Sequence, residues 1–292
     1  MGIKDIAFPN IGLYLENVPK SFSVFGFEIA LYGVIIGCGV VAGLMLAIWG
    51  AKRTKQSPDI YWDFVSYAII FSLVGGRLYY VIFSWDNYKD NLWQIFNIRG
   101  GGMAIYGAVI AAFLTLFIYC KIKKTSFFQM ADTMMPSLLL GQAIGRYGNF
   151  MNREAFGGYT DNLLAMRLPI DAVRMSDVNA DIMSHVTEGI DYIQVHPTFF
   201  YESTWNLVLI VLILIFQKYK KYEGEVVLWY LGGYGLGRAW VEGLRTDQLI
   251  IGNTGIAVSQ LLAAILVVFA VVAEIIIRIR LKKKDASVRK SK

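Results

Sequence analysis

Three long stretches of this chain contain no charged residue: residues 29–51, 100–120 and 248–273. Each is about as long as the roughly 20 apolar residues that a helix needs to cross the hydrocarbon core of a membrane. The composition agrees, because 56% of the 292 residues are hydrophobic and only 17% are charged. Soluble domains carry about a quarter charged residues, so the three stretches predict membrane-spanning helices.

Four further apolar segments are interrupted by charged residues. They cover roughly 61–83, 128–149, 200–217 and 225–243. Charged residues within a span are costly and usually serve a function, so these segments are kept as spans. We therefore predict an all-α integral membrane protein, a bundle of seven transmembrane helices.

The orientation follows from the positions of lysine and arginine. The loops after the first, third and fifth spans, together with the C-terminal tail, hold 17 of the 28 Lys and Arg residues. Positive charge gathers on the cytoplasmic side, which places the N-terminus outside and the C-terminus inside. These basic runs serve topology and contact with membrane lipids, so no nucleic-acid partner is expected.

The same pattern predicts the organisation of the chain. The stretch "IGLYLENV" near the N-terminus is amphipathic, and a polar stretch of alternating sign separates the fourth and fifth spans. The expected parts are an outer interfacial arm, four spans, a small extracytoplasmic head, three spans and a basic cytoplasmic tail, over residues 1–27, 28–149, 150–198, 199–281 and 282–292.

Three arginines lie inside these spans. Counted along the helices, Arg77, Arg146 and Arg238 all fall between the membrane midplane and the outer surface. An arginine at a helix centre costs about 2.5–3.5 kcal/mol on insertion scales, so such residues face the bundle, water or an anion. Glu202 and Glu242 could pair with two of them. The remaining guanidinium suits a lipid phosphate, which predicts a polar cavity open to the outside.

Local spacing groups further residues with the arginines. Tyr234, Arg238 and Glu242 follow one another at intervals of four, so they share one helix face, and Arg245 lies near the outer interface. Simpler interpretations stay open. Arg77 could extend to the outer interface, Arg238 and Glu242 could be a structural pair, and His196 could be an ordinary loop residue.

One segment carries a resemblance to a known family. "GQAIGRYGNFMNREAFG", residues 141–157, resembles the signature GRxGNFxNxExxG of the bacterial prolipoprotein diacylglyceryl transferases. Three other blocks are also similar to that family: "LYG", "HPTFFYES" and "YGLGRAWVEGLRTD", at residues 31–33, 196–203 and 234–247.

The resemblance implies a reaction in the bacterial cell membrane. Such enzymes move the diacylglyceryl group of phosphatidylglycerol to the thiol of the lipobox cysteine, which follows the signal peptide of a secreted prolipoprotein. A thioether forms and glycerol phosphate leaves. The family positions treated as essential match Arg146, Asn149, Gly157, Tyr234, Arg238 and Glu242, and further family positions match Tyr32 and Arg245.

The chain departs from the family at one place. Many members have a histidine in a block like GGMxxHGG, where this chain reads "GGMAIYGAV" with Tyr106. A tyrosine has a pKa near 10, against about 6.5 for histidine, so Tyr106 is a poor general base.

We predict four catalytic residues: Arg146, Arg238, Glu242 and Tyr106. The arginines hold the phosphate and stabilise its departing charge, and Glu242 orients Arg238 or accepts the thiol proton. The predicted phosphatidylglycerol-binding residues are Tyr32, Arg77, Asn149, Gly157, His196, Tyr234 and Arg245.

Other classes of function explain the sequence less well. No metal or organic cofactor is expected, because the two histidines are distant and have no acidic ligands at suitable spacing. A lipid or anion transporter would carry polar residues in both membrane halves. A seven-span receptor would not need three buried arginines at one depth.

Overall fold

The computed structural model describes residues 2, 5–98, 100–186, 189, 191–252 and 254–290. The chain divides into two compact units. Unit 1 consists of Met1–Gly43 and Met135–Lys292, and unit 2 consists of Leu44–Met134. Helices α1 (Leu31–Arg53) and α4 (Phe127–Asn152) each contribute to both units.

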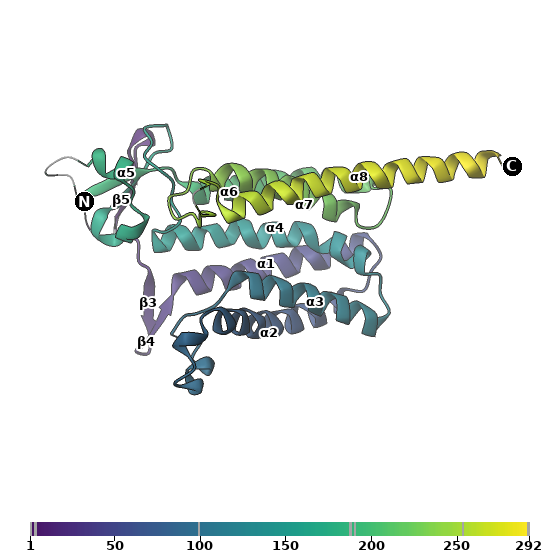
Figure 1. Ribbon diagram of the computed structural model, residues 1–292, viewed down its shortest axis with the longest axis horizontal. Helices are drawn as coiled ribbons and strands as arrows, with labels where there is room; N and C mark the ends of the chain where they lie inside the picture. The colour runs from purple at the N-terminus through teal and green to yellow at the C-terminus, as the bar shows by residue number, and fades with distance from the viewer. Residues whose placement is uncertain are drawn as a thin grey trace. The chain divides into compact units, whose positions relative to one another are not determined.

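Long helices make up most of the described chain (Figure 1). The others are α2 (Pro58–Phe83), α3 (Ile105–Lys123), α6 (Thr198–Phe216), α7 (Glu225–Glu242) and α8 (Val258–Lys290). Within the described residues, five helices are long and apolar enough to cross a membrane: α1, α2, α3, α6 and α8. The prediction of a helical membrane protein is confirmed. The two long helices outside this group, α4 and α7, carry Arg146 and Arg238.

Local chemistry sets several helix ends. Pro58 occupies the first turn of α2, where its missing N–H costs nothing. Gly224, with φ of 95°, precedes α7. The apolar run that begins at residue 248 becomes helical only at Val258, because Gly252 and Gly255 adopt φ of 50° and 71° in a turn closed by an Ile250–Ala257 bridge. The expected start of this span at residue 248 is therefore wrong, because a short loop precedes the helix, which begins at Val258.

Helices α6, α7 and α8 of unit 1 lie side by side in chain order (Figure 1). Glycine permits the close approach of α7 and α8, since a Cβ at Gly235 would lie 2.9 Å from Val267 Cγ2 and 3.0 Å from the Ala263 carbonyl oxygen. Small residues at such contacts are typical of membrane helices.

A small sheet forms the head of unit 1. Its strand order is β2-β1-β5-β6, all antiparallel. The strands are β1 (Ile6–Phe8), β2 (Leu13–Leu15), β5 (Met166–Pro169) and β6 (Tyr192–Val195). The short helix α5 (Ala180–Ser184) also belongs to the head. The N-terminal segment thus pairs with the segment between α4 and α6, which the sequence pattern did not predict.

The head has its own hydrophobic core. Its buried side chains come from both segments: Ile6, Phe8, Phe156, Met166, Leu168, Ile182, Ile193, Val195 and Phe199. Phe199 belongs to the first turn of α6, so this core also fixes the start of α6. The long helices match the all-α prediction, whereas the head contains a four-stranded antiparallel sheet.

A separate hairpin precedes α1. Strands β3 (Ser21–Val24) and β4 (Phe27–Ala30) are joined by a two-residue turn in which Phe25 and Gly26 have φ of 50° and 81°. Such a turn matches the twist of two antiparallel strands. Phe25 is 99% exposed.

Unit 2 is centred on the packing of α2 against α3. Gly75 and Gly107 meet at the contact, where a Cβ added to Gly75 would lie 2.8 Å from the Gly107 carbonyl oxygen. Tyr119 of α3 donates a hydrogen bond to the Ile60 carbonyl (3.0 Å), and Lys123 pairs with Asp63 (3.0 Å). These contacts tie together the ends of the two helices that adjoin the basic loops.

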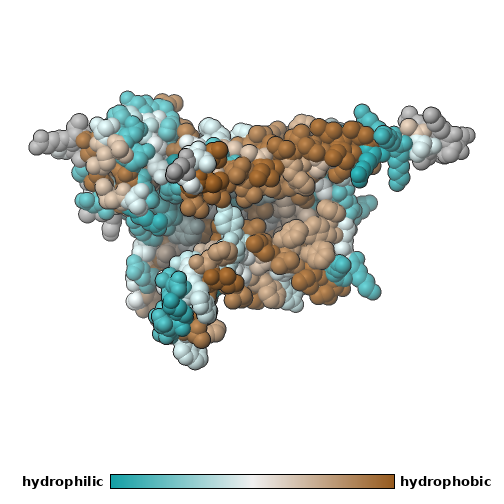
Figure 2. All heavy atoms as spheres, in the orientation of Figure 1, coloured by the Kyte–Doolittle hydropathy of each residue, from teal (hydrophilic) through white to brown (hydrophobic). Residues whose placement is uncertain are grey.

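The surface of unit 1 separates apolar from polar residues. In Figure 2, hydrophobic surface follows α7 and α8, and hydrophilic surface gathers over the head and the C-terminal end of α8. Large apolar side chains are exposed along α8, such as Ile265, Val268 and Phe269. Soluble monomers rarely expose a contiguous apolar surface of this extent, so this surface suits contact with lipid.

Candidate active site

Three helices of unit 1 bring charged side chains together at their head-proximal ends. Arg146 lies in the last two turns of α4, and Glu202 lies in the first two turns of α6. Arg238 and Glu242 lie in the last two turns of α7. The antiparallel course of α6 and α7 puts the start of one beside the end of the other, which brings these residues together.

An ion-pair chain joins these four residues. Arg146 Nη2 lies 2.5 Å from Glu202 Oε1, and Arg238 Nη1 lies 3.2 Å from Glu202 Oε2. Arg238 Nη2 lies 2.6 Å from Glu242 Oε2. Glu202 and Glu242 are only 2% and 4% exposed. One carboxylate therefore bridges two guanidinium groups from different helices, in surroundings where charge interactions are strong.

Arg245 extends the chain beyond α7. Its Nε and Nη2 donate to the two carboxylate oxygens of Asp247 at 2.8 Å and 2.6 Å, and its Nη1 lies 3.7 Å from Glu242. Burial alone would raise the pKa of Asp247, but the hydrogen bonds and charge of Arg245 outweigh it and lower that pKa. We call Arg146, Arg238, Arg245, Glu202, Glu242 and Asp247 the ion cluster; its three guanidinium groups match three carboxylates.

The signature segment supplies the next contacts. Asn149 Oδ1 accepts a long hydrogen bond from Arg146 Nη1 (3.5 Å), and Asn149 Nδ2 donates to Glu154 Oε1 (3.0 Å). Tyr32 at the start of α1 packs on Gly148, where a Cβ would lie 2.7 Å from the Tyr32 ring. Asn149 and Tyr32 therefore lie next to the helix turn that carries Arg146.

Gly157 explains the last residue of the signature. A Cβ at this position would lie 2.7 Å from His196 Cβ and 2.8 Å from the Leu244 carbonyl oxygen. Gly157 forms an isolated bridge with Arg245, and its N–H donates to the His196 carbonyl. Only glycine leaves space for the backbone next to Arg245, so the structure gives this residue a packing reason.

Tyr234 lies one turn before Arg238 on α7. It stacks on Tyr230 with ring centroids 5.5 Å apart, and the Tyr230 hydroxyl accepts a hydrogen bond from Gln142 Nε2 of α4 (3.0 Å). This polar layer lies one helical turn farther from the head than the ion cluster. Its Gln142–Tyr230 hydrogen bond joins α4 to α7 directly.

The space inside the ion cluster is small. Its lining residues leave a cavity volume of about 0 Å³, less than a water molecule requires: Arg146, Asn149, Ala155, Thr198, Phe199, Glu202 and Arg245. Known ligand pockets span about 300–1,000 Å³. A phospholipid headgroup therefore needs side chains of the cluster to move.

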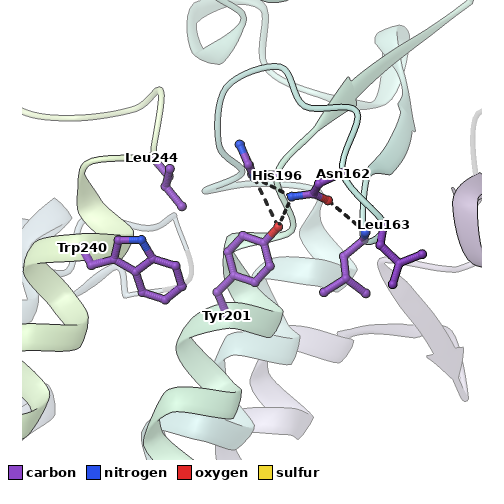
Figure 3. A pocket seen from close by; sticks show the side chains of 7 residues that line it. Asn162, Leu163, His196, Tyr201, Trp240 and Leu244 are labelled. Carbon is purple, nitrogen blue, oxygen red and sulfur yellow. Dashed lines mark hydrogen bonds between the residues drawn. The ribbon is translucent and has the colours of Figure 1, made fainter.

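A larger groove of about 410 Å³ lies beside the cluster (Figure 3). It is lined by Asn162, Leu163, Leu164, His196, Tyr201, Trp240 and Leu244. At its polar end the Tyr201 hydroxyl meets Asn162 Nδ2 (3.0 Å) and His196 Nδ1 (3.2 Å). Burial lowers the pKa of the His196 imidazole. His196 thus lies in this groove, which adjoins the cluster through Gly157 and Leu244.

Arg77 has a different environment, in unit 2. Its guanidinium donates to four backbone carbonyls, those of Gln94, Ile95, Gly101 and Gly102, at 2.6–2.8 Å. Four of its five N–H groups are thereby used. These contacts indicate that Arg77 holds the loop between α2 and α3. The sequence had suggested two other roles for Arg77, contact with the membrane interface and binding of the lipid phosphate.

Tyr106 also belongs to unit 2 and lies in the first turn of α3, where it is exposed. All members of the ion cluster belong to unit 1. Within the described residues, no three His, Cys, Asp or Glu side chains are grouped to hold a metal ion.

Sequence reasoning left out several residues that the structure brings to the site. Asp247 binds Arg245, and Thr198 donates its hydroxyl to the Ala155 carbonyl beside the signature. The position of Asp247, two residues after Arg245, could have predicted that its carboxylate pairs with that arginine. Glu202 was treated as one possible partner among two, and its position between two arginines depends on the crossing of three helices.

Comparison with known proteins shows the family of this chain. A family model described as prolipoprotein diacylglyceryl transferase matches residues 19–276. The relatives named "Phosphatidylglycerol--prolipoprotein diacylglyceryl transferase" include a protein of Clostridioides difficile, 39% identical over 91% of this chain and 96% of its own length. Another is that of Finegoldia magna, 40% identical over 91% of this chain and 98% of its own. That of Listeria monocytogenes serovar 1/2a is 42% identical over 90% of each chain. The chain therefore belongs to the prolipoprotein diacylglyceryl transferase family.

Proposed function

We propose that this protein transfers the diacylglyceryl group of phosphatidylglycerol to the lipobox cysteine of a prolipoprotein, the first step of lipoprotein lipidation. Family membership and the names of the relatives support this reaction and its two substrates. One observation supports it from the structure. Arg146 and Arg238, from two helices, both bind the Glu202 carboxylate, and two converging guanidinium groups suit a phosphate equally well.

The same proposal includes a topology. Seven helices cross the bacterial cell membrane, with the N-terminus and the head outside and the basic C-terminal tail inside. The asymmetry of Lys and Arg supports this orientation. The ion cluster would then lie in the outer half of the membrane, since it occupies the ends of α4, α6 and α7 that adjoin the head.

In this mechanism the thiol sulfur attacks the glyceryl carbon that carries the phosphate. A C–S bond forms, the C–O bond breaks with its electron pair on oxygen, and glycerol phosphate leaves. The thiol proton passes to a base or to the leaving phosphate. Arg146 and Arg238 stabilise the charge that develops on the phosphate, because they are fixed in place before the reaction.

The other residues position the reacting groups. Glu242 holds Arg238 from one turn away (2.6 Å), and Arg245 is fixed by Asp247. Asn149, Tyr234 and Tyr32 supply hydrogen-bonding groups near Arg146 and Arg238. A thiol has a pKa near 8.5, so no strong base is required to accept its proton.

The precursor peptide needs a second binding place. We assign to it the groove of Figure 3, because the groove combines apolar walls with hydrogen-bonding groups on His196, Tyr201 and Asn162. Backbone amides of a peptide can use such groups, whereas an acyl chain cannot. Trp240, exposed on the groove wall, would contact the peptide side chains.

A direct experiment tests the function. The purified full chain is incubated with phosphatidylglycerol and a cysteine-containing lipobox peptide, and the peptide is weighed by mass spectrometry. A mass gain of one diacylglyceryl group supports the proposal, and a peptide in which Ser replaces the cysteine is the control. No mass gain under conditions where phosphatidylglycerol binds would refute it.

A further inference from the structure

Glu202 occupies the place that the lipid phosphate requires. Its two carboxylate oxygens each contact a different arginine, at 2.5 Å and 3.2 Å, and the side chain is 2% exposed. The side chains around it leave a cavity volume of about 0 Å³. A single phosphate that contacts Arg146 and Arg238 together must therefore share or take the position of this carboxylate.

A buried amide without partners lies one helical turn away. Asn206 is 0% exposed, and neither its Nδ2 nor its Oδ1 has a hydrogen-bond partner within the described part of the chain. Leaving such groups unsatisfied costs about 1–3 kcal/mol. An unpaired buried amide in a native protein calls for an explanation.

The geometry of α6 connects Asn206 to Glu202. The two residues are four positions apart on one helix, so their side chains are neighbours on the same face. The Cα–Cβ bonds of a helix tilt toward its N-terminus, which inclines the Asn206 amide toward the turn that carries Glu202. Side chains at this spacing have Cβ atoms about 5–6 Å apart, a span that a glutamate side chain can cover by changing its torsions.

We propose that Asn206 is a positioning residue that receives the Glu202 carboxylate when the phosphate of phosphatidylglycerol binds between Arg146 and Arg238. This inference rests on the proposed function. Without lipid, the Glu202 carboxylate pairs with both arginines and keeps them in place. With lipid, the phosphate pairs with both guanidinium groups. The Glu202 carboxylate then accepts a hydrogen bond from Asn206 Nδ2. The amide is unpaired without lipid because its partner arrives only with the substrate.

The variant Asn206→Leu tests this exchange, because it keeps the approximate volume and removes both polar atoms. A hydrogen bond to a charged group is worth about 1.5–3 kcal/mol, so the KM for phosphatidylglycerol should rise about tenfold or more. The KM for the peptide should change less. The melting temperature should not fall, since removing an unpaired buried amide relieves its desolvation cost. A lipid KM within twofold of that of the wild type overturns the proposal.

A double-mutant cycle separates exchange from simple packing. Glu202→Gln removes the charge that must move, so Asn206→Leu should weaken lipid binding much less in that background. Affinity is read from the thermal stabilisation that phosphatidylglycerol vesicles or mixed micelles give to each variant, which requires no turnover. The same loss in both backgrounds would show that the two residues act independently, and would overturn the exchange.

Two further controls keep the test decisive. If Asn206→Leu does not fold, Asn206→Ser and Asn206→Ala form a pair that differs by one hydroxyl, and exchange requires tighter lipid binding by the serine variant. Equal binding overturns the proposal. Failure of the proposed function would give a different result: the wild type would add no diacylglyceryl mass to the peptide. The lipid-binding measurements would still decide the role of Asn206, because they require no transfer.

Discussion

Replacing Arg238 by glutamine should abolish most of the transferase activity while leaving the chain folded. Arg238 uses two different nitrogens, with Nη1 at 3.2 Å from Glu202 and Nη2 at 2.6 Å from Glu242. If these donors serve the phosphate in the transition state, each charge-assisted hydrogen bond contributes about 1.5–3 kcal/mol. The loss of two such bonds corresponds to a fall in kcat/KM of about 10²–10⁴-fold.

The folded state should suffer less. Removing one partner of a buried ion pair costs about 3–5 kcal/mol when the remaining charge is left alone. Here Glu202 keeps Arg146 at 2.5 Å, and Glu242 keeps Arg245 at 3.7 Å. Arg238→Lys should fall between the wild type and Arg238→Gln, since lysine keeps the charge but loses the planar pair of donors.

Arg278 offers a matched control at a distance from the ion cluster. It pairs with the fully buried Glu225 (2.6 Å) and also with Glu274. Arg278→Gln should lower the melting temperature but leave kcat/KM within about twofold. The assay is transfer of labelled diacylglyceryl to the lipobox peptide, with circular dichroism to follow unfolding. If Arg238→Gln keeps activity within fivefold of the wild type, or if Arg278→Gln loses as much, the phosphate-binding role of Arg238 is wrong.

Three further outcomes are expected. Tyr106→Phe should reduce transfer by no more than about tenfold, the effect of one neutral hydrogen bond, and a loss above 100-fold would assign proton transfer to its hydroxyl. Gly157→Ala should lower both the melting temperature and the activity, because the new Cβ would lie 2.7 Å from His196 Cβ. Gly158→Ala should lower neither, because no atom lies within 4 Å of a Cβ at that position. Equal changes in the melting temperatures of the two variants, measured by calorimetry, would contradict the packing argument. Because burial lowers the pKa of His196, the folded state favours the neutral ring, so its contribution to stability is present above the ordinary value of 6.5 and is lost as the pH falls. The decline in melting temperature between pH 7 and pH 5 (about the range in which histidine titrates) should therefore be shallower in His196→Gln, and an unchanged decline would refute this cause.

The helices could be predicted because their signal is local. An uncharged run such as residues 29–51 has one stable form in lipid, and α1 spans Leu31–Arg53. The run that begins at residue 248 shows the limit of this reasoning. Hydropathy cannot distinguish an apolar loop from an apolar helix, and positive φ at Gly252 and Gly255 keeps the chain from becoming helical before Val258.

The head could not be predicted in the same way. Residues Ile6–Phe8 pair with Met166–Pro169, and that pairing joins segments more than 150 positions apart. Short strands are stabilised by the partner that completes their sheet. Nothing within either segment identifies that partner.

The sequence by itself determined where Arg146, Arg238 and Glu242 lie along their helices, but it did not identify Asp247 as a partner of Arg245. Helical periodicity placed Tyr234, Arg238 and Glu242 on one face of α7, and Arg238 indeed contacts Glu242 at 2.6 Å. The tertiary structure decided which carboxylate meets which arginine. Glu202 bridges Arg146 and Arg238 only because α4, α6 and α7 bring their ends together. Rise and periodicity are properties of one helix, whereas a contact between helices depends on the packing of all of them.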